Sequence, residues 1–134
     1  MKKILFISLI GLCFVLSACS RQLTTNTLYL DAIKYIDSNI TTIINASFSR
    51  TSANGHWFVD GYGFTSLKDV YVDFEDGHYL YRALLKCDIV ENKLNSCKAL
   101  AIFEKQKQWV VIEGEDTQKN NPIIYKWAKD NFTR

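Results

Sequence analysis

The chain has 134 residues, with 16 lysines and arginines, 14 aspartates and glutamates, and two histidines. This length fits a single domain with a modest core. The formal net charge is only +2, which argues against a nucleic-acid partner, because such proteins normally carry a strongly basic surface.

The N-terminus has the order of a secretory signal peptide. Lys2 and Lys3 are followed by the apolar run 4–16, and small residues precede Cys19. The apolar run is too short to span a bilayer core of about 30 Å, which needs about 20 residues. We therefore expect residues 1–18 to be removed on export. The signal contains two lysines and no acids, so the mature chain has equal numbers of basic and acidic side chains.

The segment Leu16-Ser17-Ala18-Cys19 resembles the lipobox of bacterial lipoproteins. The resemblance implies that the Cys19 thiol receives a diacylglycerol, that cleavage occurs before it, and that a fatty acid such as palmitate acylates the new amino group. In Gram-negative bacteria an aspartate after the cysteine tends to retain a lipoprotein in the inner membrane. Ser20 therefore resembles the outer-membrane default, with the domain facing the periplasm. The alternative is an ordinary cleaved signal with an incidental cysteine.

A short tether is expected over residues 19–26, followed by one domain over residues 27–134. Residues 27–46 have the periodicity of an amphipathic helix, because apolar residues recur every three or four positions. The residues of this stripe are Tyr29, Ile33, Ile36, Ile40, Ile43 and Ile44. Isoleucine is a weak helix former, so packing against the rest of the domain must stabilise the helix.

The period then changes to two, which predicts strands over residues 57–64 and 70–75. Asp76-Gly77 follows, a strong signal for a two-residue hairpin turn that would pair Glu75 with His78. The expected core face of this hairpin is Val70, Val72, Phe74, Tyr79, Tyr81, Ala83, Leu85 and Cys87.

Four cysteines have three expected fates. Cys13 leaves with the signal and Cys19 carries lipid, whereas Cys87 and Cys97 form an even pair in an oxidising compartment. We expect this pair to form a disulfide. The alternative is a redox-active or metal-binding pair, but the spacing matches neither a C-x-x-C motif nor a zinc pattern.

A second hairpin is expected to place Cys87 opposite Cys97. That register centres on Asn92, leaves the three-residue loop 91–93, and separates the two Cα atoms by about 4.5 Å. This distance lies in the range that a disulfide tolerates. The same register predicts a core face with Cys97, Ala99, Ala101 and Phe103.

Another turn at Gln106-Lys107 leads to a strand over residues 109–113, with Val110 and Ile112 on the core face. Asn121 and Pro122 are favoured at a helix start and predict a short C-terminal helix. Its apolar side would be Ile124, Trp127, Ala128 and Phe132. The expected fold is α+β: an amphipathic helix on an antiparallel meander of four or five strands, then the short helix. In outline this resembles cystatin-like and NTF2-like shapes.

No catalytic motif or phosphate-binding loop is present, and the chain is not expected to be an enzyme or to hold a cofactor. His56 and His78 are expected on the surface, because two histidines without a third fixed ligand are weak evidence for a metal site. The acidic segment 113–116 lacks the spaced oxygens of an EF-hand, so a solvated strand end is favoured over a calcium site.

Aromatic residues are the candidate partner contacts: Trp57, Phe58, Tyr62, Phe64 and Trp109. Aromatic side chains are enriched at protein interfaces, although an edge strand with core aromatics and a bulge is the favoured interpretation of residues 57–64. A second set of apolar residues is expected on the other sheet face: Tyr71, Leu80, Leu100, Ile102, Trp109 and Val111. Either the C-terminal helix covers this set, or it forms a patch for a partner.

These features predict a small non-enzymatic envelope lipoprotein that binds the membrane through its lipid and another protein through its domain. It would be an accessory component of an envelope or secretion assembly. The alternatives are a periplasmic inhibitor or immunity lipoprotein, and a small-ligand-binding domain of NTF2-like shape.

Overall fold

The computed structural model describes residues 25–129, so the signal, Cys19 and most of the tether lie outside the described residues. A helix over residues 25–45 precedes one six-stranded antiparallel sheet. The strands are β1 (Phe58–Phe64), β2 (Asp69–Glu75), β3 (Leu80–Val90), β4 (Lys93–Lys105), β5 (Trp109–Gly114) and β6 (Tyr125–Ala128), in the spatial order β5-β4-β3-β2-β1-β6. The α+β class is confirmed, whereas the expectation of four or five strands missed β6.

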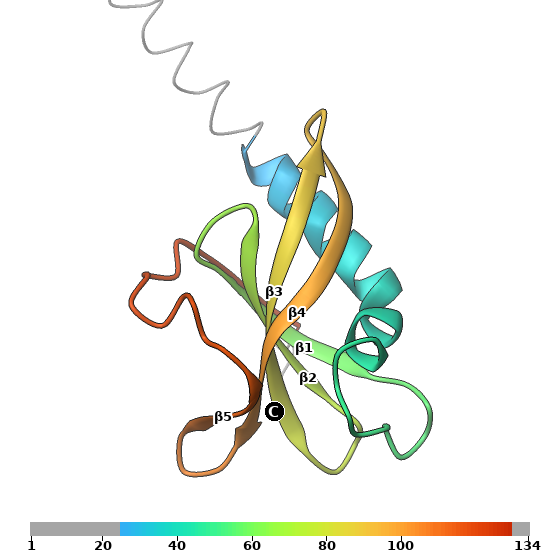
Figure 1. Ribbon diagram of the computed structural model, residues 1–134. Helices are drawn as coiled ribbons and strands as arrows, with labels where there is room; N and C mark the ends of the chain where they lie inside the picture. Colours follow the sequence, from blue (N-terminus) through green and yellow to red (C-terminus); the bar gives the residue numbers. More distant parts are fainter. Residues whose placement is uncertain (1–24, 130–134) are drawn as a thin grey trace, which may run out of the picture.

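The helix packs along one face of the sheet (Figure 1). All six residues of its predicted apolar stripe are buried, with Ile36 and Ile44 fully inaccessible. They meet side chains of β1 and β2, among which Phe64, Val72 and Phe74 are also fully buried. The main core therefore lies between the helix and the sheet, and the predicted stripe is confirmed. No helix of the described residues is long and apolar enough to span a membrane.

The hairpin between β2 and β3 has a four-residue loop rather than the expected two-residue turn. Glu75 pairs with Leu80, so the expected pairing with His78 is wrong by two residues. The cause is the Asp76 side chain, whose Oδ1 accepts hydrogen bonds from the backbone N–H groups of His78 and Tyr79, both at 2.9 Å. A two-residue shift preserves the faces of the strand. Only Tyr79 leaves the predicted core, and it is 60% exposed in the loop.

The second hairpin places Cys87 opposite Cys97 at disulfide distance, with a Cα separation of 4.1 Å, as expected. Its turn differs from the expectation, because Val90 pairs with Lys93 around the two residues Glu91 and Asn92. Both have positive φ, 49° and 61°, as a type I′ turn requires. A bulge between the cysteines and the turn absorbs the difference in length.

A further bulge in β4 overturns part of the predicted core face. Leu84 pairs with Ala101 but Leu85 pairs with Ala99, so Leu100 is an extra residue. An extra residue reverses the alternation of every side chain beyond it. Ala101 and Phe103 therefore lie on the face away from the helix, and Ile102 lies in the main core, opposite to the expectation.

The segment expected to begin a C-terminal helix forms strand β6, which pairs with β1 at the sheet edge. The alternation of aromatic residues explains why this segment forms a strand and not a helix. The ring centroid of Tyr125 lies 4.4 Å from that of Tyr29, and the centroid of Trp127 lies 5.7 Å from that of Tyr62. Residues two apart share a face in a strand but not in a helix. Phe132, the last residue of the expected helix side, lies outside the described residues.

Candidate functional site

The sheet face that points away from the helix is called here the open face. It carries a small second core of Tyr71, Leu84, Ala101 and Phe103, with Leu100 and Trp109 packed against it. No helix covers this face within residues 25–129. The crossover, residues 115–124, instead runs from β5 at one edge of the sheet to β6 at the other (Figure 1).

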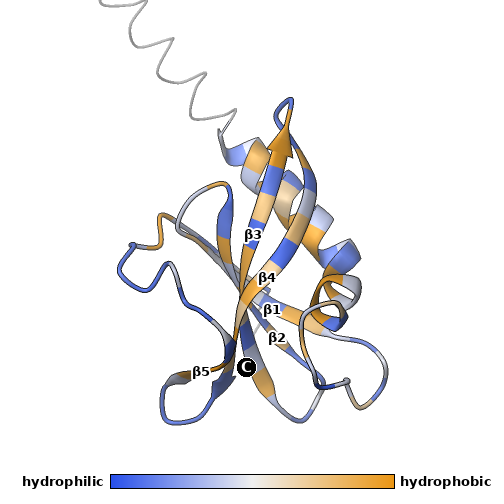
Figure 2. Cartoon of the chain, in the orientation of Figure 1, coloured by the Kyte–Doolittle hydropathy of each residue, from blue (hydrophilic) through white to orange (hydrophobic). Residues whose placement is uncertain are grey.

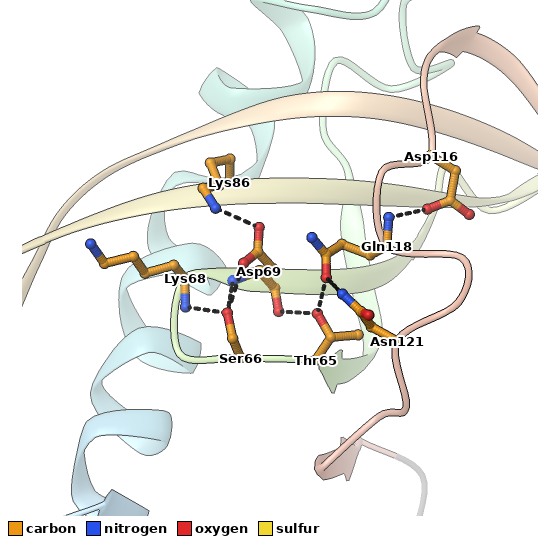
Figure 3. Close-up of polar contacts among 8 residues, drawn as sticks. All are labelled: Thr65, Ser66, Lys68, Asp69, Lys86, Asp116, Gln118 and Asn121. Atoms are coloured by element: carbon orange, nitrogen blue, oxygen red, sulfur yellow. Dashed lines mark hydrogen bonds and ion pairs between the residues drawn. The ribbon is translucent and has the colours of Figure 1, made fainter.

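Hydrogen bonds fix the crossover to the sheet. Asp116 Oδ1 accepts from the hydroxyl of Tyr71 at 2.6 Å and from the backbone N–H of Gln118 at 3.0 Å. The Gln118 side chain in turn accepts hydrogen bonds from Thr65, in the loop between β1 and β2, and from Asn121 of the crossover, as Figure 3 shows. These bonds hold one border of the open face in place.

A cleft of about 320 Å³ lies between the crossover end and the centre of the open face. Its floor includes Gly61 and Gly63, two glycines on the same face of β1. A Cβ atom at Gly63 would lie 2.9 Å from Cδ1 of Ile123, and one at Gly61 would lie 3.2 Å from the backbone oxygen of Trp127. The missing side chains thus let the last part of the chain approach β1 and leave the hollow beside it.

Charged side chains surround this cleft: Asp60, Asp73, Arg82 and Lys126. Asp73 and Arg82 are cross-strand neighbours, and the guanidinium donates to both carboxylate oxygens, at 2.6 and 2.9 Å. Their side chains are only 29% and 25% exposed. Such a bidentate pair has a fixed geometry, because the planar guanidinium matches the carboxylate.

Arg82 is also held between aromatic rings. Its guanidinium carbon lies 4.4 Å from the ring centroid of Trp109 and 5.7 Å from that of Tyr71. Cation–π contacts of this kind add to the ion pair and further reduce the side chain's freedom. The centre of the open face is therefore an ion-paired guanidinium held in one orientation beside a hollow.

The Tyr71 hydroxyl is not suited to act as a base. Burial raises its pKa far above the ordinary value of 10.0, and the hydrogen bond to Asp116 raises it further. The phenol therefore stays neutral at physiological pH and serves as a donor that secures the crossover.

The five aromatic candidates for partner contact differ in burial and in the sheet face on which they lie. Trp57, Tyr62 and Phe64 are buried in the main core, so they cannot contact a partner in this structure, and the alternative of core aromatics holds for them. Phe58 is 52% exposed. Trp109 lies on the open face against Arg82.

The feature of the site that sequence reasoning missed is the ion pair between Asp73 and Arg82. A sequence pattern does indicate the floor of the cleft, because two glycines two residues apart, Gly61 and Gly63, mark one face of a strand where another backbone comes close. No local sequence pattern indicates the ion pair, because it depends on the register between β2 and β3.

The other polar residues considered from the sequence have structural roles or lie on the surface. Glu113 accepts hydrogen bonds from the backbone and the hydroxyl of Ser49, and Asp116 accepts from Tyr71. His56 and His78 are exposed. In the described part of the chain no three His, Cys, Asp or Glu side chains are grouped so that they could hold a metal ion.

No family model, no curated protein and no solved structure matches this chain. The functional conclusion therefore depends on the residues and geometry of the open face itself.

Proposed function

We propose that this protein is a non-enzymatic envelope lipoprotein that binds another protein through its open face. The observation that carries the proposal is the Arg82 side chain, which is held by Asp73 and Trp109 at the rim of a cleft. Arginine, tyrosine and tryptophan dominate the energetics of protein interfaces. A side chain that is already ordered loses little conformational entropy on binding, which favours affinity.

The cleft adds shape to this surface. Its volume of about 320 Å³ would accept one protruding side chain of a partner beside the Arg82 guanidinium. The exposed residue Val111, which follows Trp109 on the same side of β5, extends the apolar part of the surface. An aromatic and aliphatic centre with a charged rim is the usual anatomy of a protein-binding site.

The lipid anchor is the second part of the proposal. The lipobox ending at Cys19 supports attachment to the outer membrane with the domain in the periplasm. There the protein would act as an accessory component of an envelope or secretion assembly, or as an inhibitor or immunity protein. Mass spectrometry of the N-terminal peptide would detect the diacylglycerol and the additional acyl chain on Cys19, and an unmodified cysteine would contradict the anchor.

The polar cleft is also the observation that favours a small-ligand-binding role as second candidate, because Asp60 and Asp73 both line it. The chemistry argues against catalysis, since both oxygens of Asp73 are bonded to Arg82 and Tyr71 stays neutral. In an NTF2-like shape the pocket would lie between helix and sheet. Here buried side chains such as Ile36, Val72 and Phe74 occupy that space.

Two neighbouring residues of β5 offer a matched test of the protein-binding proposal. Val110 and Val111 are each 41% exposed. Val111 pairs with Phe103 on the open face, whereas Val110 pairs with Glu104 on the opposite face. Both would be replaced by lysine, V111K and V110K, and each variant used to capture partners from solubilised envelopes.

We expect V111K to lose the captured partner and V110K to retain it, with both proteins folded by circular dichroism. Equal capture by the two variants would contradict the open face as the binding surface. Absence of any enriched protein with the unmodified chain would contradict protein binding altogether.

A further inference from the structure

A cluster of three lysines lies at the end of the domain where the tether enters. Lys86 and Lys98 are direct cross-strand neighbours in β3 and β4, and Lys68 precedes β2. The three line one hollow of about 500 Å³ together with Cys87, Asp88, Ser96 and Cys97. The backbone carbonyl of Lys68 accepts a 2.7 Å hydrogen bond from the N–H of Cys87, which fixes this loop against the hairpin.

The cluster has an excess of positive charge. Asp69 pairs with Lys86 at 2.9 Å, as Figure 3 shows, and its other oxygen accepts from the Ser66 hydroxyl. Among residues 25–129, Lys68 and Lys98 form no ion pair. Like charges placed directly opposite each other in an antiparallel pair are destabilising. Asp69 offsets this repulsion at Lys86 and Asp88 also lines the hollow, so the three ammonium groups outnumber the two carboxylates by one and leave a net positive charge for an anion.

The position of the cluster brings it to the membrane if Cys19 carries lipid. Tyr29, near the start of the helix, contacts Phe64 at the end of β1 with ring centroids 4.9 Å apart, so the loop with Lys68 lies at this end. The Tyr35 hydroxyl donates to the Asn95 carbonyl at 3.2 Å, which places the β3–β4 hairpin there too (Figure 1). Six residue steps separate Cys19 from residue 25 and span at most about 20 Å.

The same end of the molecule exposes apolar side chains. Val90 at the tip of the hairpin is 51% exposed and Leu30 on the helix is 44% exposed. Figure 2 shows the end of β3 as strongly hydrophobic beside the helix start. Basic and apolar side chains together are the composition of surfaces that lie on anionic membranes.

We propose that Lys68, Lys86 and Lys98 form a site for a phosphate group, supplied by the anionic headgroups of the membrane that holds the anchor. This inference rests on the proposed lipid anchor for its location but not on the protein-binding role of the open face. The ammonium groups provide charge-assisted hydrogen bonds to phosphate oxygens, and Ser96 provides a hydroxyl beside them. Binding would set the orientation of the domain, with the β4–β5 turn directed away from the membrane.

The test uses the mature protein, whose Cys19 lipid is first verified by mass spectrometry, inserted in phosphatidylcholine vesicles with or without phosphatidylglycerol. The rate of chemical acetylation at each lysine is then measured by mass spectrometry. We expect phosphatidylglycerol to slow acetylation of Lys68, Lys86 and Lys98 at least fivefold and to leave Lys107, in the β4–β5 turn, unchanged. Inorganic phosphate added to the phosphatidylcholine vesicles is the second arm.

Protection by phosphatidylglycerol alone would establish headgroup phosphate as the ligand. Protection by inorganic phosphate as well would support the phosphate site and make free phosphate a competing source. No protection in either arm would overturn the proposal, even if the open face captures its partner. If Cys19 carries no lipid, the anchor fails, and the same vesicles mixed with the unanchored chain still decide the lysine site.

Matched variants give an independent measurement. In K68Q/K98Q, the protection of the remaining Lys86 by phosphatidylglycerol should be lost, because each basic residue near an anionic surface contributes about fivefold and the two missing charges weaken headgroup binding by about 25-fold. K105Q/K107Q removes two exposed lysines at the β4–β5 turn and should leave that protection unchanged. Equal loss in both double variants would show a general effect of net charge and contradict a site.

Discussion

Replacing Gly114 with alanine tests whether the open face depends on the close approach of β5 to β4. Gly114 has a positive φ of 73° and pairs with Ala101 at the end of β5. An added Cβ would overlap the carbonyl oxygen of Leu100 and lie 2.9 Å from its carbonyl carbon. The same oxygen accepts a 3.1 Å hydrogen bond from the N–H of Glu115, the first residue of the crossover.

Three costs combine in G114A. A left-handed backbone costs alanine about 1–2 kcal/mol, the lost Glu115 hydrogen bond about 1 kcal/mol, and the forced backbone shift about 1–3 kcal/mol. We therefore expect the free energy of unfolding to fall by roughly 3–6 kcal/mol. Gly77 is the matched control, because its φ is also positive, 91°, but a Cβ there would meet nothing within 4 Å.

Urea unfolding of both variants, followed by circular dichroism, gives the comparison. G77A should lose only about 1–2 kcal/mol, the cost of the backbone conformation. If G114A is no less stable than G77A, the close approach to Leu100 does not constrain the chain, and the reasoning about the crossover is wrong. Should G114A fail to fold at all, G77A must still fold for the interpretation to stand.

Three further predictions concern stability and the crossover. Replacing Cys87 and Cys97 with alanine should lower the free energy of unfolding by about 2.5–3 kcal/mol, because the disulfide closes a loop with a sequence separation of 10. Urea unfolding measures this loss, and a loss below about 1 kcal/mol would contradict the prediction. The backbone hydrogen bond from Tyr79, together with that from His78, holds the pKa of Asp76 below its ordinary value of 3.8. The contribution of Asp76 to stability is therefore present above about pH 4 and lost as the pH falls. D76N should flatten this acid limb of the stability curve, and an unchanged limb would refute the role of Asp76. Tyr71→Phe removes the donor to Asp116, so amide exchange in residues 118–124 should accelerate, whereas Tyr79→Phe, at a residue 60% exposed, should leave exchange there unchanged.

The parts of the fold that follow a local period were predictable. The apolar residues of the helix recur every three or four positions and face the sheet as expected, because residues with this spacing all lie on one face of a helix. The cysteine pair fixed the register of β3 and β4 at that point, since only facing cysteines can be bridged. Both features are determined by residues close in sequence or joined by a covalent bond.

Bulges, the sixth strand and the ion pair depend on distant contacts instead. The extra residue at Leu100 reverses the faces of Ala101, Ile102 and Phe103, and the unbroken apolar run of residues 99–103 does not reveal where the reversal occurs. The segment that forms β6 suits either a short helix or a strand, and pairing with β1 decides.

The candidate site was hidden by a two-residue error in one register. The expected turn would pair Asp73 with Leu80, whereas the four-residue loop pairs it with Arg82. The side-chain hydrogen bonds of Asp76 produce this shift, and Asp-Gly alone does not reveal which loop length they select. The most informative residues of the open face therefore became apparent only from the structure.

Photocrosslinking in intact cells tests the central claim most directly. A photoreactive residue would replace Lys126, an exposed side chain at the cleft, or Lys34, whose side chain is 78% exposed on the outer side of the helix. We predict one abundant crosslinked protein from position 126 and none from position 34. Only lipid and nonspecific adducts at position 126, or the same adducts at both positions, would contradict protein binding through the open face.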